Sequence, residues 1–221
     1  MTTAPSAPSA PTVQIPRRHR LILIRHARSA PDPQRNPREW DLADEGHAAA
    51  RRLAALGLLD RADAFYAGPE PKMVHTVEPA ATSRDRQVRQ EAAFAETHSA
   101  GWVGGDAEFQ DTIQRFVEQP DQPAVPGWET AVAARERFSA GVERLRAEYE
   151  PNVNRDRVLP GTIVICTGGR MLTAYLSHLL GWTPADTFTR WQSLRMPDLA
   201  VLELHEDGQG HIVIPFGTLV V

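Results

Sequence analysis

An Arg-His pair, Arg25 and His26, directly follows the apolar run LILI at residues 21–24. An arginine guanidinium is a planar fork of N–H donors that can bind two phosphate oxygens at once. A histidine whose one ring nitrogen is held by a backbone carbonyl can attack phosphorus with the other nitrogen. An isolated pair of this kind also occurs by chance in surface loops, so the elements around it and further motifs must decide between the two interpretations.

The elements on either side of the pair have to position it. The run at 21–24 is apolar and stops abruptly at charged residues, as a buried parallel strand does, and we predict that it is the central strand. Similar runs predict strands at 63–66, 162–166, 199–205 and 211–215. Helical spacing of apolar residues, with Gly and Pro signals at the ends, predicts helices at 45–57, 69–83, 106–117, 128–149 and 170–181, although Pro79 must kink or end the second one.

Strands that alternate with helices predict an α/β fold, here a three-layer sandwich with a central, largely parallel sheet flanked by helices. Ligands of such sheets bind beyond the carboxyl ends of the strands. Three of these ends carry polar or glycine-rich segments: RHARSA, AGPEPKMVHT and TGG. We therefore expect Arg25 and His26 to meet residues of the other two loops.

The composition is typical of one globular domain. The chain has 221 residues, of which 42% are hydrophobic and 24% charged. We predict a single domain at residues 21–221. Residues 1–20 are rich in Pro, Ala, Ser and Thr without apolar periodicity, which predicts a disordered tail, and Pro interrupts them too often for a signal peptide.

Charge and cysteine usage restrict the partners. The net charge is −4 at pH 7 and the arginines form no basic stripe, which argues against a nucleic-acid partner. The apolar runs are too short to cross a membrane, and the single Cys166 cannot form an intramolecular disulfide, so we expect a cytoplasmic protein. The histidines show no metal-ligand spacing, so we predict no metal, no cofactor and a small-molecule partner.

Four blocks of the sequence resemble the histidine phosphatase superfamily, also called phosphoglycerate mutase-like, over residues 21 to about 214. They are LILIRHARSA, WDLADEGHAAARRL, AGPEPKMVHTVEPA and FAETHSAGW. In the third block Pro69 and Thr76 are in register, and Lys72 stands at the position of the family's arginine. The fourth block aligns Glu96 with the family's acidic residue. The resemblance implies the phosphoglycerate mutase-like fold.

The resemblance also implies roles for these residues. His26 would attack the substrate phosphate to form a phosphohistidine, while Arg25 and Lys72 would hold the equatorial oxygens on which negative charge spreads. Lys72 is a single point of charge and should hold phosphate less rigidly than an arginine, unless it is merely a lysine on the helix surface. Glu96 would protonate the departing alkoxide and later deprotonate water, which requires a pKa raised by burial.

Four further residues lie close enough in sequence to the motifs to contribute. Arg28 and Ser29 can reach a bound oxyanion, although solvated loop residues are an equal alternative. His98 and Trp102 either line the pocket or serve packing. The segment at 97–127 is rich in acidic and aromatic residues, and we expect it to cap the pocket and set specificity.

The largest departure from the family pattern is in TIVICTGGRM, which places Thr167 where the family has a second phosphate-binding histidine. Thr167 can donate one neutral hydrogen bond, and we expect the change to slow phosphoryl transfer by about 10² to 10³. His178 lies about three helical turns further on and cannot substitute. The amides of Gly168 and Gly169 at the following helix start could still bind an anion.

These observations leave three classes of function open. The first is an enzyme that hydrolyses a small phosphomonoester through phosphorylated His26. The second is a catalytically degenerate member that binds a phosphorylated ligand. The third is a pocket recruited to other chemistry, with His26 and Glu96 as an acid-base pair. Mutase activity is less favoured, because a mutase must retain the phosphoenzyme, and here Thr167 replaces one of the residues that bind the phosphate.

Overall fold

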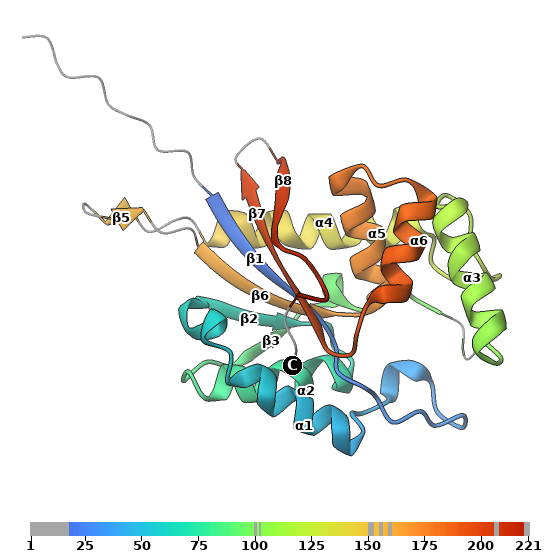
Figure 1. Ribbon diagram of the computed structural model, residues 1–221, viewed down its shortest axis with the longest axis horizontal. Helices are drawn as coiled ribbons and strands as arrows, with labels where there is room; N and C mark the ends of the chain where they lie inside the picture. Colours follow the sequence, from blue (N-terminus) through green and yellow to red (C-terminus); the bar gives the residue numbers. More distant parts are fainter. Residues whose placement is uncertain are drawn as a thin grey trace, which may run out of the picture.

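The computed structural model describes residues 18–99, 101, 103–149, 153–154, 157–158, 161–205 and 208–218. Its centre is a six-stranded sheet in the order β3-β2-β6-β1-β7-β8 (Figure 1). These strands are β1 (Arg18–Arg25), β2 (Ala64–Ala67), β3 (Val88–Gln90), β6 (Gly161–Thr167), β7 (Asp198–His205) and β8 (Gly210–Ile214). The strands β3, β2, β6 and β1 pair in parallel, whereas β7 pairs antiparallel with both β1 and β8. A separate two-stranded hairpin consists of β4 (Val153–Asn154) and β5 (Arg157–Val158).

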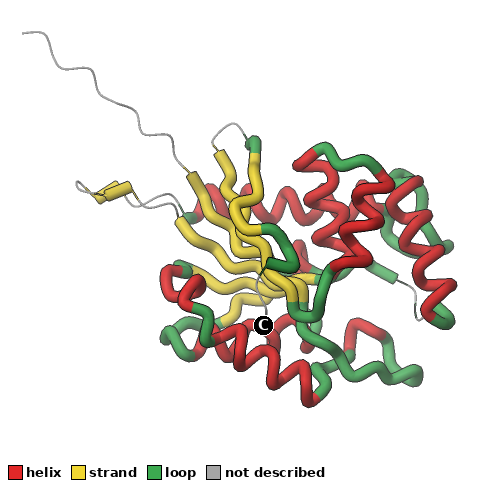
Figure 2. Tube along the Cα trace, viewed as in Figure 1, coloured by secondary structure: helices red, strands yellow, loops and turns green. Residues whose placement is uncertain are grey.

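Helices cover both faces of the sheet, and Figure 2 shows the strands as one layer between them. The helices are α1 (Asp44–Ala54), α2 (Pro71–Thr82), α3 (Asp106–Glu118), α4 (Ala131–Glu148), α5 (Gly169–Leu180) and α6 (Pro184–Ser193). In Figure 1, α1 and α2 lie on one side, α4 and α5 on the other, and α6 and α3 follow beyond α5. The predicted three-layer sandwich with a largely parallel sheet is confirmed.

Alternation along β1 fixes which residues enter which layer. Leu21 and Leu23 belong to the core under α4 and α5, whereas Ile22 and Ile24 belong to the core under α1 and α2. All four side chains have no exposed surface. Because a shift of one residue would exchange the two faces, this pattern holds the end of β1 in register with its neighbours.

The sheet begins earlier than the sequence predicts. β1 starts at Arg18, so Arg18, His19 and Arg20 belong to the strand and not to a tail at 1–20, of which the rest lies outside the described residues. The Nη2 of Arg20 lies 2.8 Å from Glu203 Oε1, and Nε2 of His19 donates to the carbonyl of Tyr149 at 3.0 Å. These polar partners let a charged segment pair within the sheet.

The sequence prediction lacks β3 and α6, as well as the β4–β5 hairpin. β3 is a short strand with largely exposed side chains, so it has no apolar pattern to find. α6 begins at Pro184 behind Thr183, whose hydroxyl accepts from the amide of Asp186 at 3.2 Å. This is an ordinary Ser/Thr-Pro start signal that the sequence does contain. α2 does not end at Pro79 but continues to Thr82.

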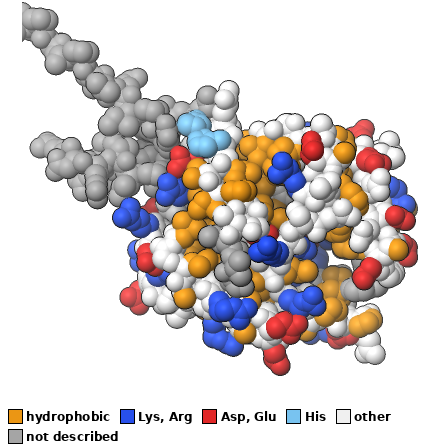
Figure 3. Space-filling model, in the orientation of Figure 1, with side chains coloured by type: hydrophobic (Ala, Val, Ile, Leu, Met, Phe, Trp, Pro, Cys, Tyr) orange, Lys and Arg blue, Asp and Glu red, His pale blue; other side chains and the backbone are white. Residues whose placement is uncertain are grey.

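None of the helices among the described residues is long and apolar enough to pass through a bilayer. In the same part of the chain, no group of three or more His, Cys, Asp or Glu side chains is arranged to hold a metal ion. On the face drawn in Figure 3, acidic and basic side chains are interspersed among apolar ones.

Candidate active site

The carboxyl ends of β1, β6 and β2 bring three loops together. Arg25 and Thr167 are register partners at the ends of β1 and β6, and the amide of His26 donates to the carbonyl of Thr167 at 3.1 Å. β2 ends at Ala67, and the chain turns into α2 at Pro71. The structure thus places the Arg-His pair at the edge of the sheet where ligands of α/β folds bind.

The ring of His26 is buried and has a defined orientation. Its Nδ1 lies 2.8 Å from the carbonyl oxygen of Ala27. Because a carbonyl can only accept, Nδ1 carries the proton and Nε2 keeps its lone pair. The amide of Ala27 in turn donates to Thr76 Oγ1 at 2.9 Å, and that hydroxyl donates to the carbonyl of Lys72 at 2.6 Å. The loop after β1 is therefore fastened to α2.

The surroundings keep His26 neutral. Burial, together with the positive charges of Lys72 and Arg25, lowers the pKa of His26 to about 3, although the Ala27 carbonyl and Glu96 act in the opposite direction. At neutral pH the imidazole is therefore unprotonated at Nε2. This is the form that a nucleophile requires.

Arg25 has hydrogen-bonding capacity to spare. Its Nη1 donates to the carbonyl of Leu194 at 2.6 Å, whereas its buried Nε has no hydrogen-bond partner among the described residues. A Cβ at Gly169 would lie 3.0 Å from this Nε, so the absent side chain gives the guanidinium room. Burial lowers the pKa of Arg25 against the attraction of Glu96 and Asp198. An unpaired buried N–H of a cation is a favourable partner for an anion.

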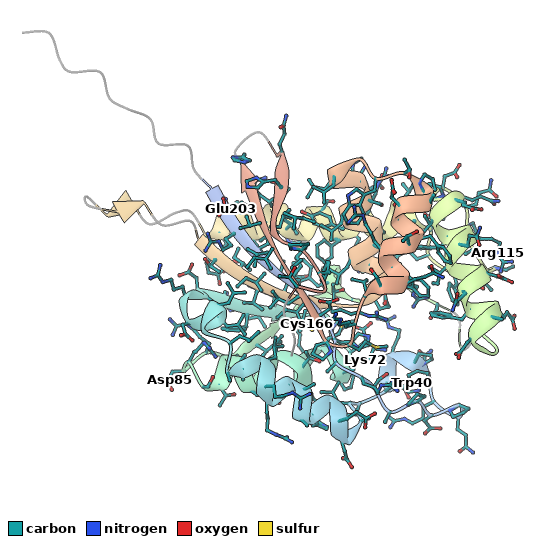
Figure 4. All side chains as sticks on the ribbon, viewed as in Figure 1. Trp40, Lys72, Asp85, Arg115, Cys166 and Glu203 are labelled. Carbon is teal, nitrogen blue, oxygen red and sulfur yellow. The ribbon has the colours of Figure 1, made fainter. Side chains whose placement is uncertain are left out.

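Lys72 is not a lysine of the helix surface, because only 6% of it is exposed. Its Nζ donates to the carbonyl of Pro37 at 2.6 Å and lies 5.7 Å from the ring centroid of Trp40. Figure 4 shows Lys72 and Trp40 next to each other. An ammonium has three donors, so Lys72 keeps donors for a ligand while the loop before α1 holds it in place.

Glu96 is buried and sits at the amino end of α5. Its Oε1 accepts from the amides of Thr97 at 2.8 Å and Met171 at 3.1 Å, and the Nε of Arg170 lies 3.8 Å away. Burial alone would raise the pKa of Glu96, but Arg170, the Thr97 amide and the nearby His26 and Lys72 lower it. The sequence predicted a raised pKa, and the structure corrects this, since the carboxylate itself is the anion bound at the helix start.

Gly168 provides the space that Glu96 occupies. It is buried as the N-cap residue of α5, and a Cβ there would overlap the carboxylate of Glu96. Both Gly168 and Gly169 are buried, and the binding of an anion by their amides stays a prediction.

We expect Gly168→Ala to lower the free energy of unfolding by about 1–3 kcal/mol, because the added methyl group must displace the carboxylate of Glu96. Urea unfolding monitored by circular dichroism measures this difference. The matched control is Gly105→Ala, since Gly105 is also an N-cap residue and a Cβ there has nothing within 4 Å. Equal losses in both variants would show that capping alone, and not the Glu96 contact, is responsible.

Thr167 does not offer the hydrogen bond that the sequence suggested. Its side chain has no exposed surface, and its hydroxyl donates to the carbonyl of Phe94 at 2.6 Å. The proton that could have reached a phosphate oxygen is therefore already used. The position of the family's second histidine contributes no donor to this side of the site.

The structure does not bring Arg28 into the cluster of Arg25, His26, Lys72 and Glu96. The Arg28 side chain is 63% exposed, and its Nε lies 3.7 Å from Glu45. Ser29 is partly buried and forms an isolated backbone bridge with Leu42.

The segment after Glu96 begins beside this cluster, where the carbonyl of Thr97 accepts from Nη2 of Arg170 at 3.3 Å. His98 is exposed, and its amide donates to Glu129 Oε2 at 3.0 Å. Trp102 lies outside the described residues. α3 packs on α6, where the rings of Phe109 and Trp191 are 5.9 Å apart. The role of this segment as a cap with a specificity function remains a prediction.

The site contains three charged residues that the sequence motifs did not single out, namely Glu70, Arg38 and Arg170. Glu70 is buried, its Oε1 accepts from the amide of Glu96 at 3.2 Å, and the Nε of Arg38 lies 3.4 Å from the same oxygen. Burial and the neighbouring Glu96 raise the pKa of Glu70. The third residue, Arg170, stacks on the ring of Trp128 at 4.8 Å. The only sequence signal for Glu70 and Arg170 was their place inside the AGPEPK and TGGR segments, and Arg38 lies in neither.

The sequence of this chain matches the histidine phosphatase superfamily (branch 1) over residues 21–214. The chain belongs to this superfamily, which confirms the resemblance of its motifs. A comparison with curated protein sequences finds no match.

Solved structures of phosphatases share the fold. Mycobacterial glucosyl-3-phosphoglycerate phosphatase aligns with a TM-score of 0.72 at 17% identity, covering 90% of this chain and 98% of that one. A variant of the phosphoserine phosphatase of Entamoeba histolytica, solved with phosphoserine, gives 0.66 at 15% identity, with 90% and 97% covered. A putative alpha-ribazole-5'-P phosphatase of Escherichia coli gives 0.68 at 13% identity, with 92% and 98% covered. At these identities the likeness establishes the fold.

Proposed function

We propose that this protein is a phosphatase that hydrolyses a small phosphomonoester through a phosphohistidine on His26. Membership of the histidine phosphatase superfamily supports the general class. The observation that carries the proposal is the state of His26, whose Nδ1 is bound to a carbonyl and whose Nε2 is unprotonated. The charges of Arg25 and Lys72 act on this same ring.

The reaction consists of two transfers of the phosphoryl group. In the first, oxygens of the substrate phosphate bind to Arg25 and Lys72, and Nε2 of His26 attacks phosphorus. The ester P–O bond breaks, and the leaving oxygen takes a proton from Glu96. In the second, Glu96 removes a proton from water, the water oxygen attacks the phosphohistidine, and the P–N bond breaks to release inorganic phosphate.

The state of Glu96 determines how well the first transfer proceeds. With its pKa lowered, this carboxyl is ionised in the free protein at neutral pH and has no proton to give. A bound phosphate dianion places negative charge beside it, which raises the pKa of a carboxyl. A larger fraction of Glu96 therefore carries a proton to donate in the substrate complex than in the free protein.

Glu96→Gln is expected to lower kcat/KM, which reports the first transfer, by about 10²-fold or more for an alkyl phosphate, because an alkoxide leaving group needs a proton. For p-nitrophenyl phosphate, whose leaving group is stable as an anion, the loss should be less than about tenfold. Steady-state kinetics with both substrates measures the contrast. Equal losses for the two substrates would contradict the assignment of Glu96 as the acid.

The lowered pKa also predicts the direction of the pH dependence. The protonated form of Glu96 becomes more populated as pH falls, so kcat for the alkyl phosphate should rise between pH 7 and pH 5. His26 stays neutral over this range, because its pKa is about 3. The same pH series with Glu96→Gln serves as the control, since the dependence that remains there belongs to the phosphate of the substrate.

A panel of sugar, nucleotide and amino-acid phosphates tests the proposed activity and identifies the substrate class. We expect phosphate release from at least one compound at a rate that saturates with concentration. If no compound is turned over faster by the protein than by a His26→Ala variant, the phosphatase proposal is wrong.

Binding without turnover is a second candidate, and it is favoured by two observations. The hydroxyl of Thr167 is occupied by Phe94, and Glu96 is held as an anion at the start of α5. Both would weaken catalysis more than binding. Calorimetric binding of a phosphomonoester that the protein does not hydrolyse would support this candidate, and phosphorylated His26 would exclude it.

In this proposal the partner is a small phosphorylated molecule. The cytoplasmic location stays a prediction from the sequence; Cys166 is a free, buried thiol.

A further inference from the structure

The site contains a cation that the superfamily motifs do not account for. Arg170 follows Thr167, Gly168 and Gly169 and lies in the first turn of α5. Only 11% of its side chain is exposed. The segment TIVICTGGRM therefore has a threonine where the family has a histidine, and a largely buried arginine three positions later.

The guanidinium of Arg170 is held by contacts on several sides. Its plane lies over the ring of Trp128, with Cζ 4.8 Å from the centroid. Nη2 donates to the carbonyl of Thr97 at 3.3 Å, and Nε lies 3.8 Å from Oε1 of Glu96. Within the part of the chain that the structure describes, Nη1 donates to no protein acceptor. A rigidly stacked arginine with free N–H groups is well suited to bind an oxyanion.

Arg170 and the proposed nucleophile are both close to the carboxylate of Glu96: the Nε of Arg170 lies 3.8 Å from Glu96 Oε1, and the charge of Glu96 acts on His26. Glu96 interacts electrostatically with Arg170, Lys72 and His26, and Arg170 is close enough to lower the pKa of Lys72, whose main cause of lowering is burial. The cations at the site (Arg25, Arg38, Lys72 and Arg170) outnumber the carboxyl groups that act on them (Glu70, Glu96 and Asp198), so net positive charge remains around the neutral imidazole. A phosphate dianion is the kind of ligand that relieves this arrangement.

We infer that Arg170 binds an oxygen of the phosphoryl group and replaces the cation that is missing at Thr167. The inference rests on the proposed function, since it needs the phosphate site beside His26. A planar fork on a neighbouring turn supplies two donors where the family's histidine supplies one. In this arrangement the phosphate site does not lose the cation that is missing at Thr167, because Arg170 supplies it three positions later.

The assignment has a consequence for the acid. Arg170 is the largest of the charges that lower the pKa of Glu96. When phosphate draws this guanidinium toward itself, the attraction that keeps Glu96 ionised becomes weaker. Binding of the substrate and protonation of the acid are coupled through one side chain.

Titration calorimetry with inorganic phosphate tests the inference without any need for turnover. Arg170→Gln in the full chain should weaken phosphate binding by about 10- to 100-fold, the range typical of a hydrogen bond to a charged group. The phosphate affinity of Arg170→Lys, which keeps the charge but not the planar guanidinium, should lie between those of Arg170→Gln and the wild type. The matched control is Arg190→Gln, because Arg190 also stacks on a tryptophan, with Cζ 4.4 Å from the ring of Trp182.

A double variant distinguishes direct contact between Arg170 and phosphate from an effect of Arg170 that acts only through Glu96. If Arg170 touches phosphate, Arg170→Gln weakens binding by a similar factor in a Glu96→Gln background. An unchanged phosphate affinity in either background overturns the inference, as does a wild type that binds no phosphate. Loss of binding with Arg170→Gln, in a wild type that turns over no substrate, would uphold the inference while the phosphatase proposal fails.

Discussion

His26→Ala should reduce kcat/KM for a phosphomonoester by at least about 10⁴-fold, because removal of a nucleophile removes the covalent route altogether. The ring is buried and uncharged, and its Nδ1 satisfies only the Ala27 carbonyl. The variant should therefore remain folded, and its phosphate affinity should persist because Arg25 and Lys72 remain.

The control for this variant is His47→Ala. His47 is partly exposed on α1, and its Nε2 lies 4.0 Å from Asp41. We expect its turnover to equal that of the wild type. If His26→Ala retained more than a tenth of the activity, nucleophilic attack by His26 would be ruled out.

Arg25→Gln should lower kcat/KM by about 10²- to 10³-fold, the effect typical of removing a preorganised donor from the developing charge. The loss of stability should be small. The hydrogen bond to the Leu194 carbonyl is lost, but the burial of a cation whose Nε–H has no partner is relieved. Kinetics and urea unfolding, measured on the same preparation, separate the two effects.

Arg28→Gln is the matched control, because Arg28 follows in the same loop but is exposed and pairs with Glu45. We expect less than about a twofold change in kcat/KM, as for the removal of an exposed surface ion pair. A loss comparable to that of Arg25→Gln would mean that Arg28 reaches the substrate in the complex. The position of Arg28 would then depend on a bound ligand.

The sequence predicts the fold well where local pattern and function coincide. The apolar runs of β1 and β6 end at Arg25 and Thr167, so the chain itself marks the edge of the sheet where the site lies. Gly181 was predicted to end α5, and it does so with a φ of 64°, a conformation that glycine adopts without strain. The sequence did not predict β3, because an exposed edge strand has no periodic pattern of apolar residues.

The state of each polar group in the site could not be predicted in the same way. A threonine after a strand can donate to solvent, ligand or backbone, and only the approach of Phe94 directs the hydroxyl of Thr167 inward. Burial by itself suggested a raised pKa for Glu96. The charge of Arg170, which comes from a helix far along the chain, and the amide of Thr97 lower the pKa instead.

Arg170 shows why a motif comparison can underestimate a site. The comparison asks whether a histidine stands at one position, whereas phosphate binding depends on where positive charge and N–H groups lie in space. A cation three positions further on the first turn of α5 can meet that need. The weakened phosphate site expected from Thr167 therefore has to be judged together with Arg170.

Mass spectrometry of the trapped enzyme tests the central claim most directly. The protein is mixed with p-nitrophenyl phosphate, quenched in base to preserve phosphohistidine, digested and sequenced. We predict one phosphoryl group on His26, formed before steady-state turnover and absent from His26→Ala. Turnover with no phosphoryl group on His26, or with the group on another residue, would contradict the account.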